Sequence, residues 1–187
     1  MGFSKKIIIY LCDFKAYIEI SYGNFYISKE FLLLDSTDTK ILHLLQTDAS
    51  LSVKEIAAQV ALSVTPCWKR IQRLEAAGFI RARVALLDPV KVNAAVTVFV
   101  AIKTDRHTRE WIERFHLVVN ELPEVMEAYR MSGEIDYLLR VAVDSIAAYD
   151  RFYKTLIDRI ELSNVTSSFA MEQMKYTTAL PINLEGP

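Results

Sequence analysis

The chain has 187 residues, is 52% hydrophobic and 24% charged, and carries a net charge of −1. This length allows one domain or two small ones, and the composition is that of a globular protein rather than a disordered one. The five glycines lie too far apart for the phosphate-binding patterns GxGxxG or GxxxxGK, the two cysteines form no CxxC pair, and the three histidines form no HExxH motif. No apolar run approaches the roughly 20 residues that cross a bilayer. We therefore expect a cytoplasmic protein that is not an enzyme, binds no membrane, and needs no metal or cofactor.

Residues 1–33 form an extension whose status the sequence leaves open. Lys5 and Lys6 precede a short apolar run, but Asp13 interrupts it before it reaches the roughly 7–15 residues of a signal peptide's hydrophobic segment. The alternation of aromatic and polar residues predicts one or two strands. The next methionine is Met126, and an upstream-extended reading frame is the alternative to a native segment. We assign residues 1–33 no function.

Residues 34–91 carry the signals of a helix followed by a helix-turn-helix. Asp35 and Asp38 suit the N-terminus of the first helix, because short acidic side chains satisfy its free N–H groups and its dipole. Ser52 and Glu55 have the spacing of a capping box, which predicts the start of a second helix. A brief turn then leads to a third helix.

The third helix of this region has a clear beginning and end. Pro66 falls in its first turn, where a missing N–H does no harm, and Gly78 suits the left-handed cap that follows a helix. The apolar stretches 79–84 and 85–87 come next and predict a small β-wing. We therefore expect a winged helix-turn-helix DNA-binding domain over residues 34–91.

A helical wheel divides the third helix into an apolar face and a basic face. The apolar face is predicted to pack in the domain core and consists of Val64, Cys67, Trp68, Ile71 and Leu74. The opposite arc carries Lys69, Arg70 and Arg73. Because the second helix of a helix-turn-helix enters the major groove of double-stranded DNA, we predict DNA contacts from Ser63, Thr65, Lys69, Arg70, Arg73, Arg81 and Arg83. The alternative is an ordinary solvated helix face.

Residues 92–180 alternate strands and helices in the order βαββαβ. Strands are predicted over 94–103, 125–131, 137–143 and 165–172, with helices over 106–122 and from the cap at Asp144 and Ser145 to Ile160. This order predicts a ferredoxin-like sheet with both helices on one face, and an α+β protein overall. The other face of the sheet needs a cover, and a second copy is the simplest one, so we predict a homodimer. Residues 181–187 are left as a tail.

Residues 34–180 resemble the leucine-responsive regulatory protein/AsnC (feast/famine) family of transcriptional regulators. In chain order, the motifs are LDxxDxxIL from Leu34, LSxTPC from Leu62, RxxRLExxGFI from Arg70 and SGxxDYLL from Ser132. The resemblance implies a winged helix-turn-helix joined to a βαββαβ ligand-sensing domain, in dimers that often form higher oligomers. It also implies a sequence-specific DNA-binding regulator that responds to an amino acid or related small effector, bound near a turn made of Met131, Ser132, Gly133, Glu134 and Asp136.

The chemistry of that turn suits an α-amino acid. The Asp136 carboxylate can accept hydrogen bonds from an ammonium group, and backbone N–H groups at Gly133, where no Cβ blocks approach, can donate to a carboxylate. The alternative is that Gly133 only permits the turn and that Asp136 satisfies turn N–H groups. At the level of the whole chain, the alternative is an amino-acid-binding regulatory module without DNA binding. The basic arc on the third helix favours the DNA-binding function.

Overall fold

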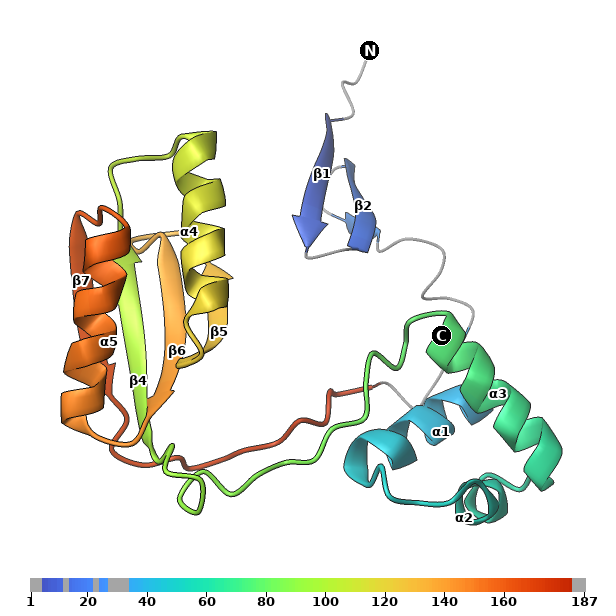
Figure 1. The fold of residues 1–187 in the computed structure, drawn as a ribbon. Coiled ribbons are helices and arrows are strands. Elements are labelled where there is room, and N and C mark those ends of the chain that lie inside the picture. The colour runs from blue at the N-terminus through green and yellow to red at the C-terminus, as the bar shows by residue number, and fades with distance from the viewer. Residues whose placement is uncertain (1–4, 12–13, 22–23, 27–33, 183–187) are drawn as a thin grey trace. The chain divides into compact units, whose positions relative to one another are not determined.

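The structure is a computed structural model that describes residues 5–11, 14–21, 24–26 and 34–182 (Figure 1). The chain divides into two compact units, one formed by residues 1–84 with 177–187 and the other by residues 85–176. Among the described residues, no helix combines the length and the apolar character that crossing a membrane requires.

The N-terminal extension forms a small antiparallel sheet. Strand β1 (Lys5–Leu11) pairs with β2 (Phe14–Ser21), and β2 pairs with β3 (Asn24–Tyr26). The sequence predicted one or two strands here, and three are present.

Three helices follow, and two of them begin with the predicted caps. Helix α1 (Ser36–Thr47) starts at a capping box in which the Asp35 side chain accepts the N–H of Asp38 at 2.8 Å. Helix α2 (Val53–Gln59) starts at a second box, in which a Glu55 carboxylate oxygen accepts the N–H of Ser52 at 2.7 Å. These reciprocal bonds satisfy N–H groups that have no partner inside the helix.

Helix α3 (Val64–Ala76) completes the helix-turn-helix. Gly78 follows it with φ +78°, the left-handed conformation predicted for its end. The three helices enclose one apolar core, whose buried members are Ile41, Leu42, Leu45, Ile56, Ala57, Val60, Cys67, Ile71 and Leu74.

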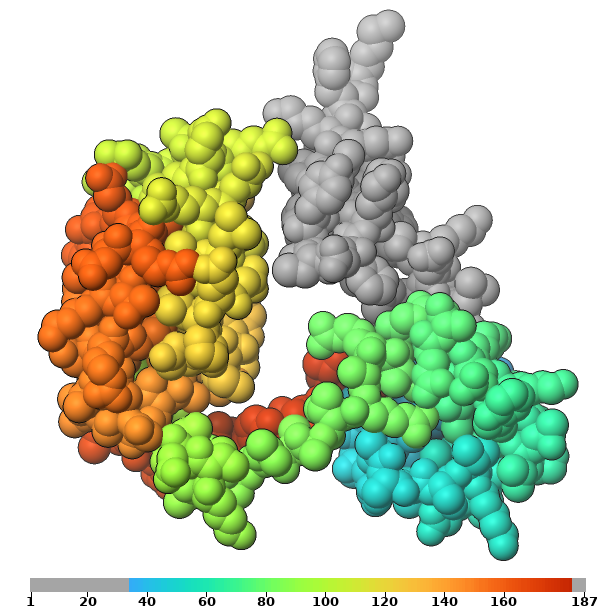
Figure 2. Space-filling model, in the orientation of Figure 1, coloured from blue at the N-terminus to red at the C-terminus, as the bar shows by residue number. Residues whose placement is uncertain are grey.

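The predicted β-wing does not form. Residues 77–95 are all described and contain no strand, and residues 81–92 are exposed throughout. Figure 2 shows the green segment that leaves the first unit as a narrow run of atoms rather than a packed hairpin, and residues 89–93 after it form a turn. The stretch lacks an Asn-Gly or similar turn that would fold it back on itself, so its apolar residues have no strand to pair with. Phe79 and Ile80 instead pack against the helical core.

The second unit has the predicted ferredoxin-like fold. Its elements are β4 (Val96–Lys103), α4 (Arg109–Glu121), β5 (Val125–Arg130), β6 (Tyr137–Val143), α5 (Ile146–Arg159) and β7 (Asn164–Phe169). The sheet has the order β5-β6-β4-β7 with every neighbouring pair antiparallel. Both helices cover the same face of this sheet (Figure 1). The last strand ends at Phe169, three residues before the predicted Glu172.

The two faces of this sheet differ in how they are covered. Along β6, burial alternates strictly, with the buried residues facing α4 and α5 and Leu138, Arg140 and Ala142 facing away. The register pairs Leu138 with Tyr129 and Ala101, and Arg140 with Glu127 and Phe99. Because paired residues share a face, the outer face carries Phe99, Ala101, Tyr129, Leu138 and Ala142 around a Glu127–Arg140 ion pair of 2.6 Å. Phe99 is 40% and Tyr129 50% exposed.

The C-terminal segment returns to the first unit. The Gln46 side chain of α1 makes two hydrogen bonds with the backbone of Leu180, donating to its carbonyl at 3.0 Å and accepting from its N–H at 2.9 Å. Ile182 packs against the helical core. Residues 177–182 therefore belong to the first unit, whereas the sequence placed residues up to 180 with the second. Most of the predicted tail, residues 183–187, lies outside the described residues.

Candidate functional site

The exposed side of α3 differs from the predicted one. Cys67, Ile71 and Leu74 are buried as expected, but Val64 and Trp68 are each 49% exposed. The prediction that Trp68 anchors α3 in the core is therefore wrong. At 100° per residue, Trp68 lies roughly 90° from the middle of the buried stripe and therefore at its margin.

The two arginines of α3 are bound to the start of α1. The Arg70 guanidinium lies 2.5 Å from an Asp35 carboxylate oxygen and 2.9 Å from Asp38, and Arg73 forms an ion pair with the other oxygen of Asp38. Asp38 is completely buried. We predicted that Arg70 and Arg73 point away from the domain, and this is corrected: both guanidinium groups face α1, because a buried carboxylate there requires cationic partners.

This cluster places charges where they hold α1 and α3 together. The side chains of Arg70 and Arg73 remain 31% and 58% exposed, so Arg73 has a surface left for a further partner. The pKa of Asp35 is lowered from its ordinary value of 3.8, first because its carboxylate accepts the N–H of Asp38; partial burial opposes this shift and Arg70 adds to it. Since the pKa is lower in the folded chain, this stabilisation is complete above about pH 4 and is lost as the pH falls through the folded pKa.

The other predicted DNA-contacting residues lie on the open side of the first unit. Ser63 precedes α3 without capping it through its side chain, and Thr65 and Lys69 are exposed on the helix. Arg81 is exposed on the extended segment that replaces the wing, while Arg83 pairs with Glu75 of α3 at 2.9 Å. Ser63, Thr65 and Lys69 are thus exposed at the start of α3 and along it, as is Trp68, which the sequence assigns to the core.

The predicted effector turn joins β5 to β6. Gly133 has φ +131°, and a Cβ built there would meet no atom within 4 Å. The Met131 N–H donates to the Asp136 carbonyl at 2.8 Å, which closes the turn, and Ser132 is exposed within it. The exposed Glu134 carboxylate binds Lys103 at 3.0 Å.

Asp136 itself already has a backbone partner. One of its carboxylate oxygens accepts the N–H of Thr104 at 2.8 Å, and its own N–H donates to Ile102 at 2.9 Å. These bonds match the alternative in which Asp136 satisfies N–H groups near the turn. They also fix its position beside the end of β4.

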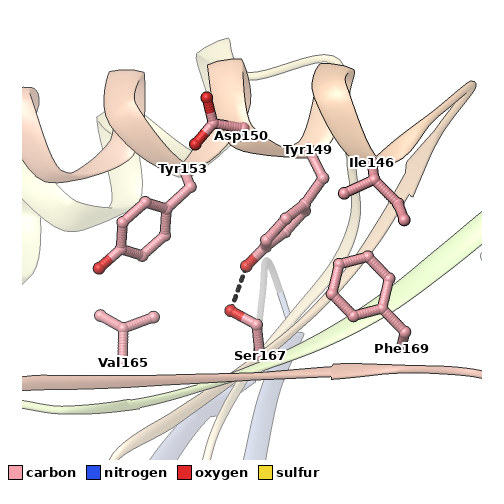
Figure 3. Close-up of a pocket in the computed structure, with 7 residues that line it drawn as sticks. All are labelled: Ile146, Tyr149, Asp150, Tyr153, Val165, Ser167 and Phe169. Carbon is pink, nitrogen blue, oxygen red and sulfur yellow. Dashed lines mark hydrogen bonds between the residues drawn. The ribbon is translucent and has the colours of Figure 1, made fainter.

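A pocket that the sequence did not predict lies between α5 and β7 (Figure 3). It has a volume of about 320 Å³ and is lined by Ile146, Tyr149, Asp150, Tyr153, Val165, Ser167 and Phe169. The Tyr149 hydroxyl is hydrogen bonded to that of Ser167, and burial raises the pKa of Tyr149. Asp150 is paired with Lys154 at 2.6 Å.

The position and lining of this pocket separate it from the predicted effector turn. Strand β7 forms one edge of the sheet, whereas the turn leads from β5, the other edge strand, to β6. No lining residue is cationic, so the pocket offers no charged partner for the carboxylate of an amino acid. No sequence motif marked it, because its walls come from a helix face and a strand face that become neighbours only in the fold. Nowhere in the described ranges do His, Cys, Asp or Glu side chains gather in a group that could hold a metal ion.

Comparisons with known proteins match both units. Residues 34–75 match the AsnC-type helix-turn-helix domain, and residues 97–180 match the Lrp/AsnC ligand binding domain. The DNA-binding transcriptional activator DecR of Escherichia coli K12 is 54% identical to this chain over 151 residues, which cover 80% of this chain and 99% of DecR.

Solved structures give the same result. The crystal structure of an AsnC family transcriptional regulator from Agrobacterium tumefaciens is 61% identical, covers 79% of this chain and 97% of its own, and has a TM-score of 0.77. A transcriptional regulator from Neisseria meningitidis, crystallised as a complex with L-methionine, is 37% identical, covers 80% of this chain and 97% of its own, and also has a TM-score of 0.77.

Proposed function

This chain belongs to the Lrp/AsnC family of transcriptional regulators, and on that premise we propose that it binds double-stranded DNA through α3 and changes this binding when an amino acid occupies its second unit. The observation that carries the DNA-binding part is the open side of α3, where Thr65 and Lys69 face solvent directly after the helix-turn-helix turn. A regulator of this kind works in the compartment that holds the DNA, which fits the cytoplasmic location expected from the sequence.

Each candidate DNA-contacting residue has a role that follows from its surroundings. Lys69 and Arg81 are exposed cations that suit phosphate groups, and the Ser63 and Thr65 hydroxyls lie at the N-terminus of α3, where N–H groups attract anions. Arg70 and Arg73 position α3 through Asp38, and Arg73 keeps enough exposed surface to reach a phosphate as well. Arg83, paired with Glu75, contributes less.

The ion pairs of Arg70 and Arg73 also lend weight to a second candidate function. A regulatory module that had lost DNA binding would keep both arginines, because they neutralise the buried Asp38 carboxylate. Lys69 distinguishes the two functions, since no ion pair with an acidic residue holds it in the described part of the chain and a module without DNA would have no need of its charge.

The first prediction is that DNA affinity falls steeply with salt. A bound dimer that neutralises about four phosphates should lose roughly 100-fold in affinity between 50 and 200 mM salt. Binding releases counterions from the DNA, and this release is less favourable at higher salt. Fluorescence polarisation of a labelled promoter fragment with the full-length chain measures this. Lys69→Ala should make the salt dependence shallower, whereas Lys154→Ala, which removes an exposed lysine from α5, should not. Salt-independent affinity would show that the cations of α3 neutralise no phosphates, and absence of binding at 50 mM salt would favour the module without DNA binding.

The effector part of the proposal places an amino acid at the turn of residues 131–136. The Neisseria meningitidis relative bound to L-methionine supports this class of ligand. In this chain, Asp136 would accept from the ammonium group, and the backbone around Gly133, open to solvent, would receive the carboxylate. Met131, Ser132 and Glu134 surround this position and would contact the ligand.

The second prediction separates the two roles of Asp136. Asp136→Asn keeps an oxygen that accepts the N–H of Thr104 but removes the negative charge that an ammonium group needs. We expect the variant to keep the wild-type melting temperature and DNA affinity, while the rise in melting temperature caused by L-methionine or another responsive amino acid is lost. A screen of the twenty amino acids by thermal shift measures this. An unchanged ligand response would assign Asp136 to the turn alone.

The proposal includes a homodimer that forms through the outer face of the second unit's sheet, and higher oligomers built from it. Phe99, Tyr129 and Leu138 make this face apolar, and in a single chain no described helix covers it. Two copies placed face to face would bury these side chains. The dimer would carry two α3 helices, as do helix-turn-helix dimers that bind two DNA half-sites.

A further inference from the structure

The open side of α3 carries a large apolar side chain beside its cation. Trp68 is 49% exposed, and Thr65, Lys69 and Gln72 are exposed on the same helix. Spacings of three and four residues place these positions on one side of α3. Packing does not explain this placement of Trp68, since the core is filled from the other side by Cys67, Ile71 and Leu74.

We propose that Trp68 enters the major groove and packs its ring against the C5-methyl group of a thymine, so that the preferred DNA sequence carries a thymine at that position. This inference rests on the DNA-binding function proposed above. The neighbouring Lys69 favours DNA as the occupant of this surface. A second copy of the chain or another apolar protein surface that covered Trp68 would also have to bury this lysine charge, which is costly without a partner, whereas DNA supplies phosphates.

The chemistry of the groove favours thymine over the other bases. The thymine methyl group is the apolar group that base pairs present in the major groove. The indole has one N–H donor and no acceptor, so most of its surface can contribute only apolar contact. Arg70 and Arg73 are the arginines of α3 that could read guanine, and both are paired with Asp38. We therefore expect α3 to select thymine through Trp68 rather than guanine through its arginines.

The test compares thymine with uracil, which lacks only the methyl group. A preferred sequence is first selected from random duplexes with the full-length wild-type chain, and each thymine in it is then replaced by uracil in turn. At one position per half-site we expect wild-type affinity to fall roughly three- to fivefold, because one buried methyl contact is lost. Trp68→Ala should bind the thymine duplex about tenfold more weakly than the wild type does. This variant should bind the uracil duplex with the same affinity as the thymine duplex.

A second readout reports contact at Trp68 directly. The other tryptophan, Trp111, is only 7% exposed, so acrylamide quenching of the fluorescence reports mainly on Trp68. Selected DNA should protect this fluorescence in the wild type. Leu117→Ala, which shortens a 64% exposed apolar side chain on α4 in the other unit, serves as the matched control and should keep both the thymine preference and the protection.

Each outcome of these two experiments either supports or overturns the contact between Trp68 and thymine. If Trp68→Ala keeps the difference between thymine and uracil, or if the difference is absent in the wild type while DNA is bound, the assignment of Trp68 is overturned and the DNA-binding function stands. A change in sedimentation or melting temperature in Trp68→Ala, with the thymine preference retained, would show that Trp68 is covered by protein. If selection enriches no sequence and no duplex binds, the proposed function itself fails.

Discussion

Asp38→Asn is expected to lower the free energy of unfolding of the full-length chain by about 2–4 kcal/mol. Removing one partner of a buried ion pair typically costs about 3–5 kcal/mol, because an unpaired charge stays behind. The cost is smaller here, since Arg70 and Arg73 are 31% and 58% exposed and reach water when released. Urea unfolding followed by far-UV circular dichroism measures the change.

A matched control for this variant lies in the same unit. Asp48→Asn replaces an exposed aspartate whose carboxylate accepts hydrogen bonds from Ser50, and asparagine can keep them, so we expect a loss below about 0.5 kcal/mol. If Asp38→Asn were as mild as Asp48→Asn, the cluster would not be what holds α3 to α1. DNA affinity of the folded Asp38→Asn variant should also fall, because α3 would no longer be fixed in orientation.

The second large effect is expected from Phe99→Glu. If two copies meet through the outer face of the sheet, this change buries a second carboxylate beside the Glu127–Arg140 ion pair. One arginine cannot neutralise both acids, and the dimer dissociation constant should rise at least about 100-fold. Sedimentation velocity at several concentrations measures the shift from dimer to monomer. The second unit should remain folded, since Phe99 faces away from its core.

The control for Phe99→Glu is Leu117→Glu. Leu117 is 64% exposed on α4, which covers the opposite face of the sheet, so the same change there should leave the dimer intact. A Phe99→Glu chain that sediments as the wild type would place the contact between copies elsewhere and leave the outer face to another partner.

Local sequence patterns predicted the elements of the fold well. The capping boxes at Asp35 and Ser52 depend on residues three positions apart, so their partners are visible in the sequence, and both are present. Strand β6 has the predicted bounds because Gly133 marks the turn before it and its residues are strongly apolar. The family, the fold class and the regulatory function followed from motifs of the same local kind.

What the sequence could not give depends on partners distant in the chain. Arg70 and Arg73 were predicted to face outward, because the basic arc was assessed without Asp38, which lies 32 and 35 residues earlier. Trp68 was assigned to the core on its apolar character, although its position on the helix is at the margin of the buried stripe. The pocket beside Ser167 could not be predicted, because its lining residues come from α5 and β7 and become neighbours only when the helix packs on the strand.

The return of the C-terminal segment to α1, fixed by Gln46 and Leu180, changes how the two units are connected. The main chain passes from the first unit to the second after residue 84 and comes back before residue 177. The second unit is thus inserted between two segments of the first. Two covalent connections therefore join the units, and the second continues into the segment bound to α1, the helix whose first turn holds α3 through Asp38.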